Sequence, residues 1–444
     1  MTKSSQDLRR QALASSHDRV LDAVKAFALA VVVIGHSAAW DVSSGTPASV
    51  LDNRPALAWL TWTLQVLPLF FAAGAVGNLA SWRRQPRSAP FLQRRLLRLA
   101  TPALLYATVW TTILLPIAVV APQAEELGRF LSQLLWFLGV YAAVVLAVPL
   151  TSRWVAHPGW TLGLWLTVIV VVDVLRWNTA PMVGWLNLLL VWGWLHQLGY
   201  YLPVLRRWRP ARSLVLATAA LGLAIALAFL GPYSSSLVSF VGDPEPSNLA
   251  PPTLVVALYG LAQVLVLAAV WPWLARLLAH DRTWLVVAAF GSRAVEIYLW
   301  HIQGVALVAA TALALGFDAE PLGALWWLAH AAGLAAVVVL AWYCAGIAAG
   351  ADRRLSAWGV RRTGHTAPVL PFSLVIPLVL LSITATGFGT WWGAGMLGLP
   401  ASSAVNLLVL AGAWWALTQA PRRIPALPTG TPPRYGQDRR DPRA

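Results

Sequence analysis

The sequence predicts an all-α integral membrane protein with about 12 transmembrane helices. Of its 444 residues, 58% are hydrophobic and 11% are charged, whereas a soluble chain carries about 25% charged residues. Apolar runs of about 20 residues, the length that crosses a hydrocarbon core, recur along the whole chain. Because every backbone amide in lipid must bond within its own segment, these runs are expected to be helices.

The apolar runs place twelve spans in order along the chain. We expect them at residues 24–40, 56–80, 99–120, 130–150, 160–177, 182–202, 213–231, 252–272, 285–315, 323–348, 370–388 and 402–418. The ninth run is too long for one straight span and contains Gly291 followed by Ser292. We therefore expect an interfacial helix near 283–290 and a true span from about 294.

Basic residues alternate between the loops. With the N-terminus inside, the outer loops hold only Arg54, Arg129 and Arg176, and the other 29 of the 32 lysines and arginines lie on the inner side. Positively charged loops stay in the cytoplasm, so the pattern predicts a cell-membrane protein with both termini in the cytoplasm. This orientation accounts for the net charge of +15, and no nucleic-acid partner is expected.

The spans also predict how the chain is divided. The expected segments are a cytoplasmic N-terminal segment (1–18), a membrane core (19–348), a basic cytoplasmic loop (349–369), two additional transmembrane helices (370–418) and a disordered basic cytoplasmic tail (419–444). No loop is long enough for a separate soluble domain. The single cysteine, Cys344, excludes a structural disulfide. No His-x-x-x-His pair or carboxylate cluster occurs, so no metal site is expected.

Ionisable side chains inside a membrane are expensive, and the first span holds the most informative set. Arg19, Asp22 and Lys25 precede an apolar stretch that ends at His36. Lys25 and His36 lie on one helix face, about 16 Å apart along the axis, and Asp22 is one turn before Lys25 and can pair with it. The alternative is that Arg19 and Lys25 are positive-inside anchors and that His36 is an interfacial histidine.

Four other polar residues in the spans are interpreted as structural. His196 and His330 match no motif. Asp173 and Arg176 lie near an outer helix end, where we expect them to pair with each other.

The first-span residues are one of four motifs by which the chain resembles the membrane acyltransferase-3 family, which includes bacterial O-acyltransferases of surface sugars, lipids and antibiotics. The matching residues are Arg19, Asp22, Lys25 and His36; Phe70, Phe71 and Gly74; Arg95 and Arg98, with Arg94 beside them; and Ser292, Tyr298 and His301. The motifs follow the family's order, which makes 19–348 an acyltransferase-like core. Members usually have ten core helices, so the two C-terminal helices are additional. The extracytoplasmic esterase-like domain of many members has no counterpart here.

The resemblance implies acyl-CoA as a co-substrate on the cytoplasmic side and no bound cofactor. Acyl transfer needs a base for the hydroxyl, stabilisation of the oxyanion and a grip on the donor. Fork-shaped guanidinium groups suit phosphate, so the donor-binding candidates are Arg94, Arg95 and Arg98, together with Arg19, Asp22 and Lys25. A positive-inside cluster would place the same arginines there.

Three residues are the catalytic candidates. His36 would be the general base or a transient acyl carrier, both of which suit an imidazole. Glu296 and His301 share a late apolar helix but are about 140° apart around it, so we expect one of the two to face His36. The alternative for both is a helix-to-helix hydrogen bond.

The expected function is therefore O-acyl transfer in the membrane lipid, with acetyl or another short-chain group moved from acyl-CoA to a hydroxyl of a carbohydrate, a lipid-linked sugar or a small metabolite. A transporter is one alternative, although no paired halves are seen. A lipid-linked glycosyltransferase is another, but the acids of the first outer loop, Asp41 and Asp52, are not clustered.

Overall fold

The structure is a computed structural model that describes residues 18–42, 48–49, 59–238, 247–360, 368–395 and 398–419. Within these residues, ten helical segments are long and apolar enough to cross a membrane, so the chain is a multi-pass membrane protein. The helices that form them are α2 (Arg19–Ala38), α3 (Leu60–Leu64) with α4 (Leu67–Arg84), α5 (Ser88–Ile117), α6 (Gln123–Ser132) with α7 (Leu135–Thr151), α8 (Pro158–Asn178), α11 (Pro210–Leu230), α12 (Leu254–Leu277), α14 (Ala294–Trp300) with α15 (Ile302–Ala314), α16 (Ala324–Val360) and α17 (Val369–Thr386).

The two other expected spans coincide with shorter helices. α9 (Asn187–Gly199) has 13 residues and α18 (Ser403–Gln419) has 17, whereas a full crossing needs about 20. The count of twelve spans therefore stays a prediction. The remaining elements are the 3₁₀ helices η2 (Ser152–Ala156) and η3 (Pro181–Leu186), the helices α10 (Leu202–Leu205) and α13 (Asp281–Gly291), and two antiparallel strand pairs, β1 (Trp40–Asp41) with β2 (Ala48–Ser49) and β3 (Gly393–Ala394) with β4 (Pro400–Ala401).

Two boundaries bear on the expected spans. The break in the ninth run is confirmed, because α13 ends at Gly291 and α14 begins at Ala294. The expected loop 349–369 differs from the structure, because α16 continues as helix to Val360. The added stretch contains three alanines, two arginines and one leucine, which favour helix, and no proline. The expected terminal segments lie outside the described residues, apart from Asp18 and Gln419.

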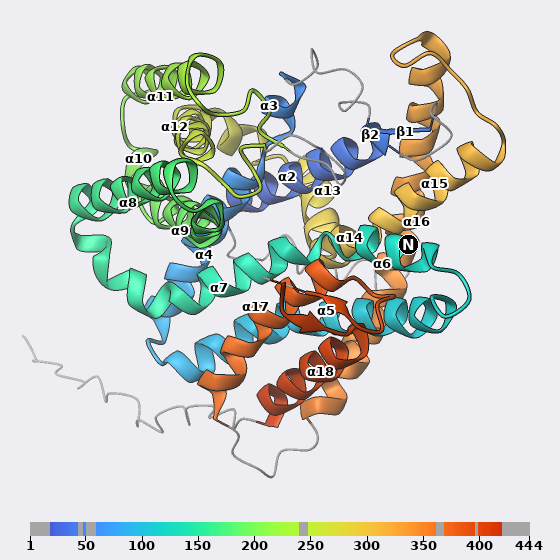
Figure 1. Ribbon diagram of the computed structural model, residues 1–444. Helices are drawn as coiled ribbons and strands as arrows, with labels where there is room; N and C mark the ends of the chain where they lie inside the picture. Colours follow the sequence, from blue (N-terminus) through green and yellow to red (C-terminus); the bar gives the residue numbers. More distant parts are fainter. Residues whose placement is uncertain are drawn as a thin grey trace, which may run out of the picture.

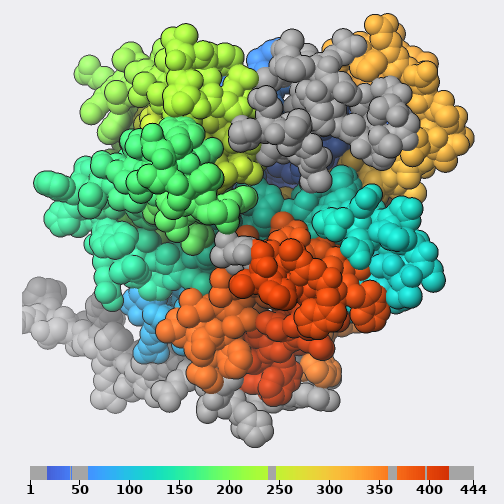
Figure 2. Space-filling view, in the orientation of Figure 1, coloured from blue at the N-terminus to red at the C-terminus, as the bar shows by residue number. Residues whose placement is uncertain are grey.

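Helix α2 runs through the middle of the bundle and packs against α4, α13 and α16 (Figure 1). Helices α8, α9, α11 and α12 form one group, at the upper left of Figure 1, and α11 packs along α12. The C-terminal helices α17 and α18 pack against α7 and α5, at the bottom of the view. The space-filling view shows these two groups as separate blocks, green and orange-red (Figure 2).

Candidate active site

The start of α2 is tied to α13 and to the end of α12. Asp18 caps the helix by accepting hydrogen bonds from the amides of the second and third residues that follow it. Arg19 donates to the carbonyl of Leu278 (3.0 Å), lies 3.7 Å from a carboxylate oxygen of Asp281, and stacks over the ring of Trp284. Arg19 therefore joins three elements at the basic end of the bundle, which we define as the end where α2 and α5 begin.

Asp22 and Lys25 form the expected ion pair, with Nζ 3.2 Å from a carboxylate oxygen. Both side chains are about one third exposed, at 29% and 31%. Beyond them, the helix face that leads to His36 carries only apolar residues, which line a cavity described below.

The histidine at the other end of this face meets a second histidine. Nδ1 of His36 lies 2.9 Å from Nε2 of His301, which is the residue after α14. The two ring planes are within 3° of parallel. His301 is fully buried and His36 is half-buried. The structure thus brings together two of the three catalytic candidates, from segments 265 residues apart.

The hydrogen bonds of this pair determine which nitrogen carries each proton. Nδ1 of His301 faces the carbonyls of Tyr298 (2.7 Å) and Ile297 (3.2 Å). A carbonyl can only accept, so we assign the proton of His301 to Nδ1 and the lone pair to Nε2. His36 must then donate from Nδ1, which leaves the lone pair of its Nε2 free. No described residue contacts that nitrogen by a hydrogen bond. His36 is therefore placed as a base whose ring is oriented by His301.

Glu296 is not brought to the histidine pair. Among the described residues, no hydrogen bond joins it to His36 or His301. It lies toward the basic end of α14, within electrostatic range of Arg98, Arg293 and Arg353. Of the two expected partners of His36, the structure selects His301.

The three arginines of α5 have different surroundings. Arg95 is half-buried and donates to the carbonyl of Gly77 (2.9 Å). Arg94 is exposed and donates to Oε1 of Gln85 (3.1 Å), and it lines an open groove at the basic end. The other residues of that groove are Ser81, Arg84, Gln85, Pro86 and Arg87. Arg98 is exposed and has no ion pair in the described part of the chain. The guanidinium groups of Arg94 and Arg98 are therefore available to an anionic ligand.

The motif residues of α4 are packing residues. Phe71 is fully buried and stacks on Trp192, with ring centroids 4.8 Å apart. Phe70 packs edge-on against Phe137 and lines the cavity. A Cβ at Gly74 would lie 2.5 Å from Oη of Tyr141, so glycine is needed there for the close approach of that ring.

Of the two remaining motif residues, Ser292 lies in the break between α13 and α14, and Tyr298 lies in α14. Ser292 is exposed and donates only to the carbonyl of Ala289 (2.8 Å), one turn back, which makes it a local capping residue. Tyr298 is buried, donates from Oη to the carbonyl of Leu134 (2.9 Å) and lines the cavity.

Sequence reasoning missed a polar cluster on three helices. Nδ2 of Asn78 lies 3.1 Å from Nε2 of His196 and 3.3 Å from Oη of Tyr141. The Tyr141 hydroxyl is left with a proton to donate. The three residues come from three different helices, α4, α7 and α9, so no local motif could have identified the cluster.

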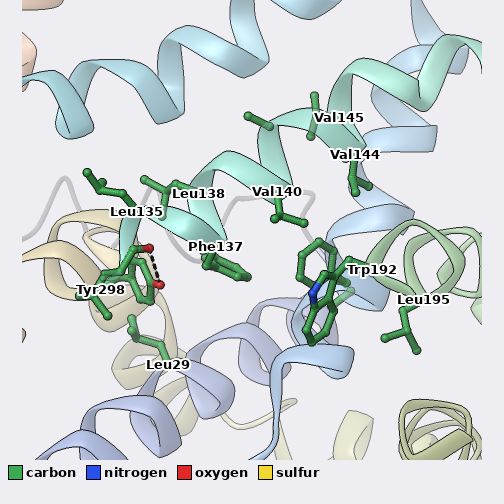
Figure 3. Close-up of a cluster of buried hydrophobic side chains, with 14 of the residues drawn as sticks. Leu29, Leu135, Phe137, Leu138, Val140, Val144, Val145, Trp192, Leu195 and Tyr298 are labelled. Atoms are coloured by element: carbon green, nitrogen blue, oxygen red, sulfur yellow. Dashed lines mark hydrogen bonds between the residues drawn. The ribbon is translucent and has the colours of Figure 1, made fainter. Parts of the chain in front are cut away.

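An apolar cavity of about 60 Å³ lies between the basic end and the histidine pair. Its walls come from five helices, and they are formed by Ala28, Leu29, Val32, Leu67, Phe70, Leu99, Phe137, Leu138, Tyr141, Ala294, Val295 and Tyr298. Figure 3 shows the Phe137 ring below α7, with Tyr298 to its left and Leu29 of α2 below them.

A family model for an acyltransferase domain (acyltransferase-3) matches residues 18–346, about three quarters of the chain. The match includes His36, Arg95, Arg98 and His301, and leaves out α17 and α18. No curated protein and no solved structure matches the chain. The chain therefore belongs to the acyltransferase-3 family and is a multi-pass membrane acyltransferase.

Proposed function

We propose that the protein transfers an acyl group from acyl-CoA, bound at the cytoplasmic side of the cell membrane, to a hydroxyl group of a carbohydrate, lipid-linked sugar or small metabolite. The observation that supports this most is the free Nε2 of His36, held by His301. A half-buried imidazole with one lone pair free and the other nitrogen fixed is suited to general base catalysis.

The reaction follows from this geometry. The hydroxyl of the acceptor gives its proton to Nε2 of His36 while its oxygen attacks the thioester carbonyl carbon. The C–S bond then breaks, and the CoA thiolate takes the proton from His36. His301 holds the His36 ring and stabilises the imidazolium through the bond to Nδ1, much as the carboxylate of a hydrolase triad orients its histidine.

Placing the donor at the basic end is supported by its charge. The phosphates of CoA require cationic donors, and Arg94 and Arg98 have guanidinium groups that form no ion pair in the described part of the chain. Arg95 is held by Gly77 and also borders this region. The basic end faces the cytoplasm in this proposal, in agreement with the distribution of arginine along the sequence.

The proposal is tested by release of CoA thiol from purified protein in lipid nanodiscs, with a panel of acyl-CoA donors and an envelope extract as acceptor. His36→Ala should lower the rate by about 10²–10⁴-fold. His157→Ala is the matched control, because that histidine is exposed in a loop. Equal rates for the wild type and His36→Ala would exclude His36 as the base.

A second measurement separates base from acyl carrier. If His36 acts as the base, protein mixed with acyl-CoA and no acceptor keeps its intact mass. A transient adduct of the mass of the acyl group, absent in His36→Ala, would instead show that Nε2 accepts the acyl group.

A further inference from the structure

The apolar cavity lies one helical turn from both histidines. On α2 its lining ends at Val32, four residues before His36, and on α14 it ends at Tyr298, three residues before His301. Residues at these spacings lie on the same face of a helix. The cavity is therefore adjacent to the histidine pair, on the side of the basic end.

Four of the residues that line the cavity are aromatic rings packed on one another. Phe137 packs against Phe70, Tyr298 and Tyr141, with ring centroids 5.1, 5.3 and 6.1 Å away. Tyr298 is fixed by its hydrogen bond to the carbonyl of Leu134, drawn as the dashed line in Figure 3. Tyr141 is fixed by Asn78. Phe137 is the ring that touches all three of the others.

The chemistry of the lining selects the occupant. The surface that faces the cavity is apolar throughout. An amide buried there would lose its hydrogen bonds to water and gain none, which costs about 2–7 kcal/mol for each group. The amide-bearing arm of CoA is therefore a poor occupant, whereas a hydrocarbon chain is a good one.

The volume limits the length of that chain. The cavity has about 60 Å³, less than half of the roughly 150 Å³ of an engineered apolar cavity that binds benzene. A chain of about two to four carbons is the largest that fits without displacing a wall.

We propose that this cavity binds the acyl chain of the donor and that Phe137 sets the accepted length at about two to four carbons. The inference rests on the proposed function, since it places the carbonyl of the donor at His36. It makes Phe137 a specificity-determining residue on a helix that carries none of the recognised motifs.

The test measures kcat/KM for thiol release with acyl-CoA donors of two to ten carbons. Phe137→Leu removes three carbons from a wall and should raise the ratio of six-carbon to two-carbon kcat/KM by about 10-fold. Ala28→Val adds two methyl groups to the wall formed by α2 and should lower the ratio of four-carbon to two-carbon kcat/KM by a similar factor. Phe388→Leu is the matched control, because this phenylalanine is fully buried but lies outside the cavity, and it should leave both ratios unchanged.

The outcomes separate this inference from the proposed function. Absence of thiol release from the wild type with every donor would refute the proposed function. Release with the same chain-length profile in the wild type and both cavity variants would overturn the acyl pocket alone. A KM raised equally for all chain lengths would also overturn it, because the cavity would then hold the arm common to all donors. Since Ala28→Val and Phe137→Leu change the volume in opposite directions, failure of one variant to fold leaves the other as the test.

Discussion

Two buried polar sites differ in how completely their hydrogen bonds are filled. Asp173 of α8 is fully buried, and its two oxygens accept from Nδ2 of Asn187 (3.0 Å), Oη of Tyr233 (3.1 Å) and the amide of Leu254 (2.9 Å). Arg176 adds the expected ion pair at 3.9 Å. Burial, and then the Asp173 carboxylate, raise the pKa of Tyr233, so this hydroxyl keeps its proton and continues to donate. The His36–His301 pair, in contrast, leaves Nε2 of His36 without a partner among the described residues.

The difference separates a structural site from a reactive one. A buried polar group whose hydrogen bonds are all formed within the protein stabilises the fold and has no donor or acceptor left for a ligand. His330 is enclosed in another way: its two nitrogens face the carbonyls of Trp326 (2.9 Å) and Trp40 (3.0 Å), and its buried ring lies between those two indoles, which leaves no room for a ligand. His36 is a half-buried histidine with one nitrogen held and one free.

The largest expected effect is on stability at the filled site. Asp173→Ala leaves the donors of Asn187 and Tyr233 and the charge of Arg176 without their acceptor, and should cost about 3–5 kcal/mol. Thermal unfolding in detergent measures the loss, and Asp173→Asn, which keeps one acceptor oxygen, should lose less. Thiol release per folded molecule should stay at the wild-type level, and a selective loss of kcat would show that this site is not purely structural.

Removing the orienting histidine should affect the rate more than stability. His301→Ala frees the His36 ring, so kcat should fall about 10²-fold while KM for the donor is kept. His301→Gln should recover part of the rate, because the amide oxygen of the glutamine can accept a hydrogen bond from Nδ1 of His36. If kcat falls no further in His301→Ala than in the surface variant His157→Ala, the histidine pair is only a helix-to-helix contact.

A smaller effect is expected where Tyr141 passes over α4. Gly74→Ala places a Cβ 2.5 Å from Oη of Tyr141 and should destabilise the fold by about 1–3 kcal/mol. Adding Tyr141→Phe removes the closest atom and should restore part of the unfolding temperature. Full additivity of the two changes would contradict the close approach.

The smallest effect is expected at the Asp22–Lys25 pair. Both side chains are about one third exposed, so a double-mutant cycle with Asp22→Asn and Lys25→Gln should give a coupling energy of less than about 1 kcal/mol. A rise in KM for acyl-CoA in Lys25→Gln would then report contact with the donor rather than lost stability. An unchanged KM would leave Lys25 as an anchor of α2.

Much of the fold could be predicted from the sequence because membrane helices are recognisable as long apolar runs. The break after Gly291 and the pairing of Asp22 with Lys25 follow from local spacing, and both are found. The helical extension of α16 to Val360 could not be inferred from hydropathy, because that stretch carries Asp352, Arg353 and Arg354. The spacing of residues along the chain locates the helices but does not determine the residue at which each helix ends.

The site was predictable only in part, for a physical reason. The motif around His301 identified two candidates to face His36, but choosing between Glu296 and His301 requires the rotation of α14 relative to α2, which packing sets. Phe137 and Tyr141 come from α7, which carries no motif, and they reach the cavity through tertiary contacts alone.

Chemical modification can show whether Nε2 of His36 is free. Diethyl pyrocarbonate acylates an imidazole lone pair, and peptide mass spectrometry locates the product. Among the histidines within the bundle, His36 should be modified before His196 and His330, in step with the loss of thiol release. Modification of His330 first, or loss of activity while His36 is still unmodified, would show that Nε2 of His36 is not the free, reactive nitrogen.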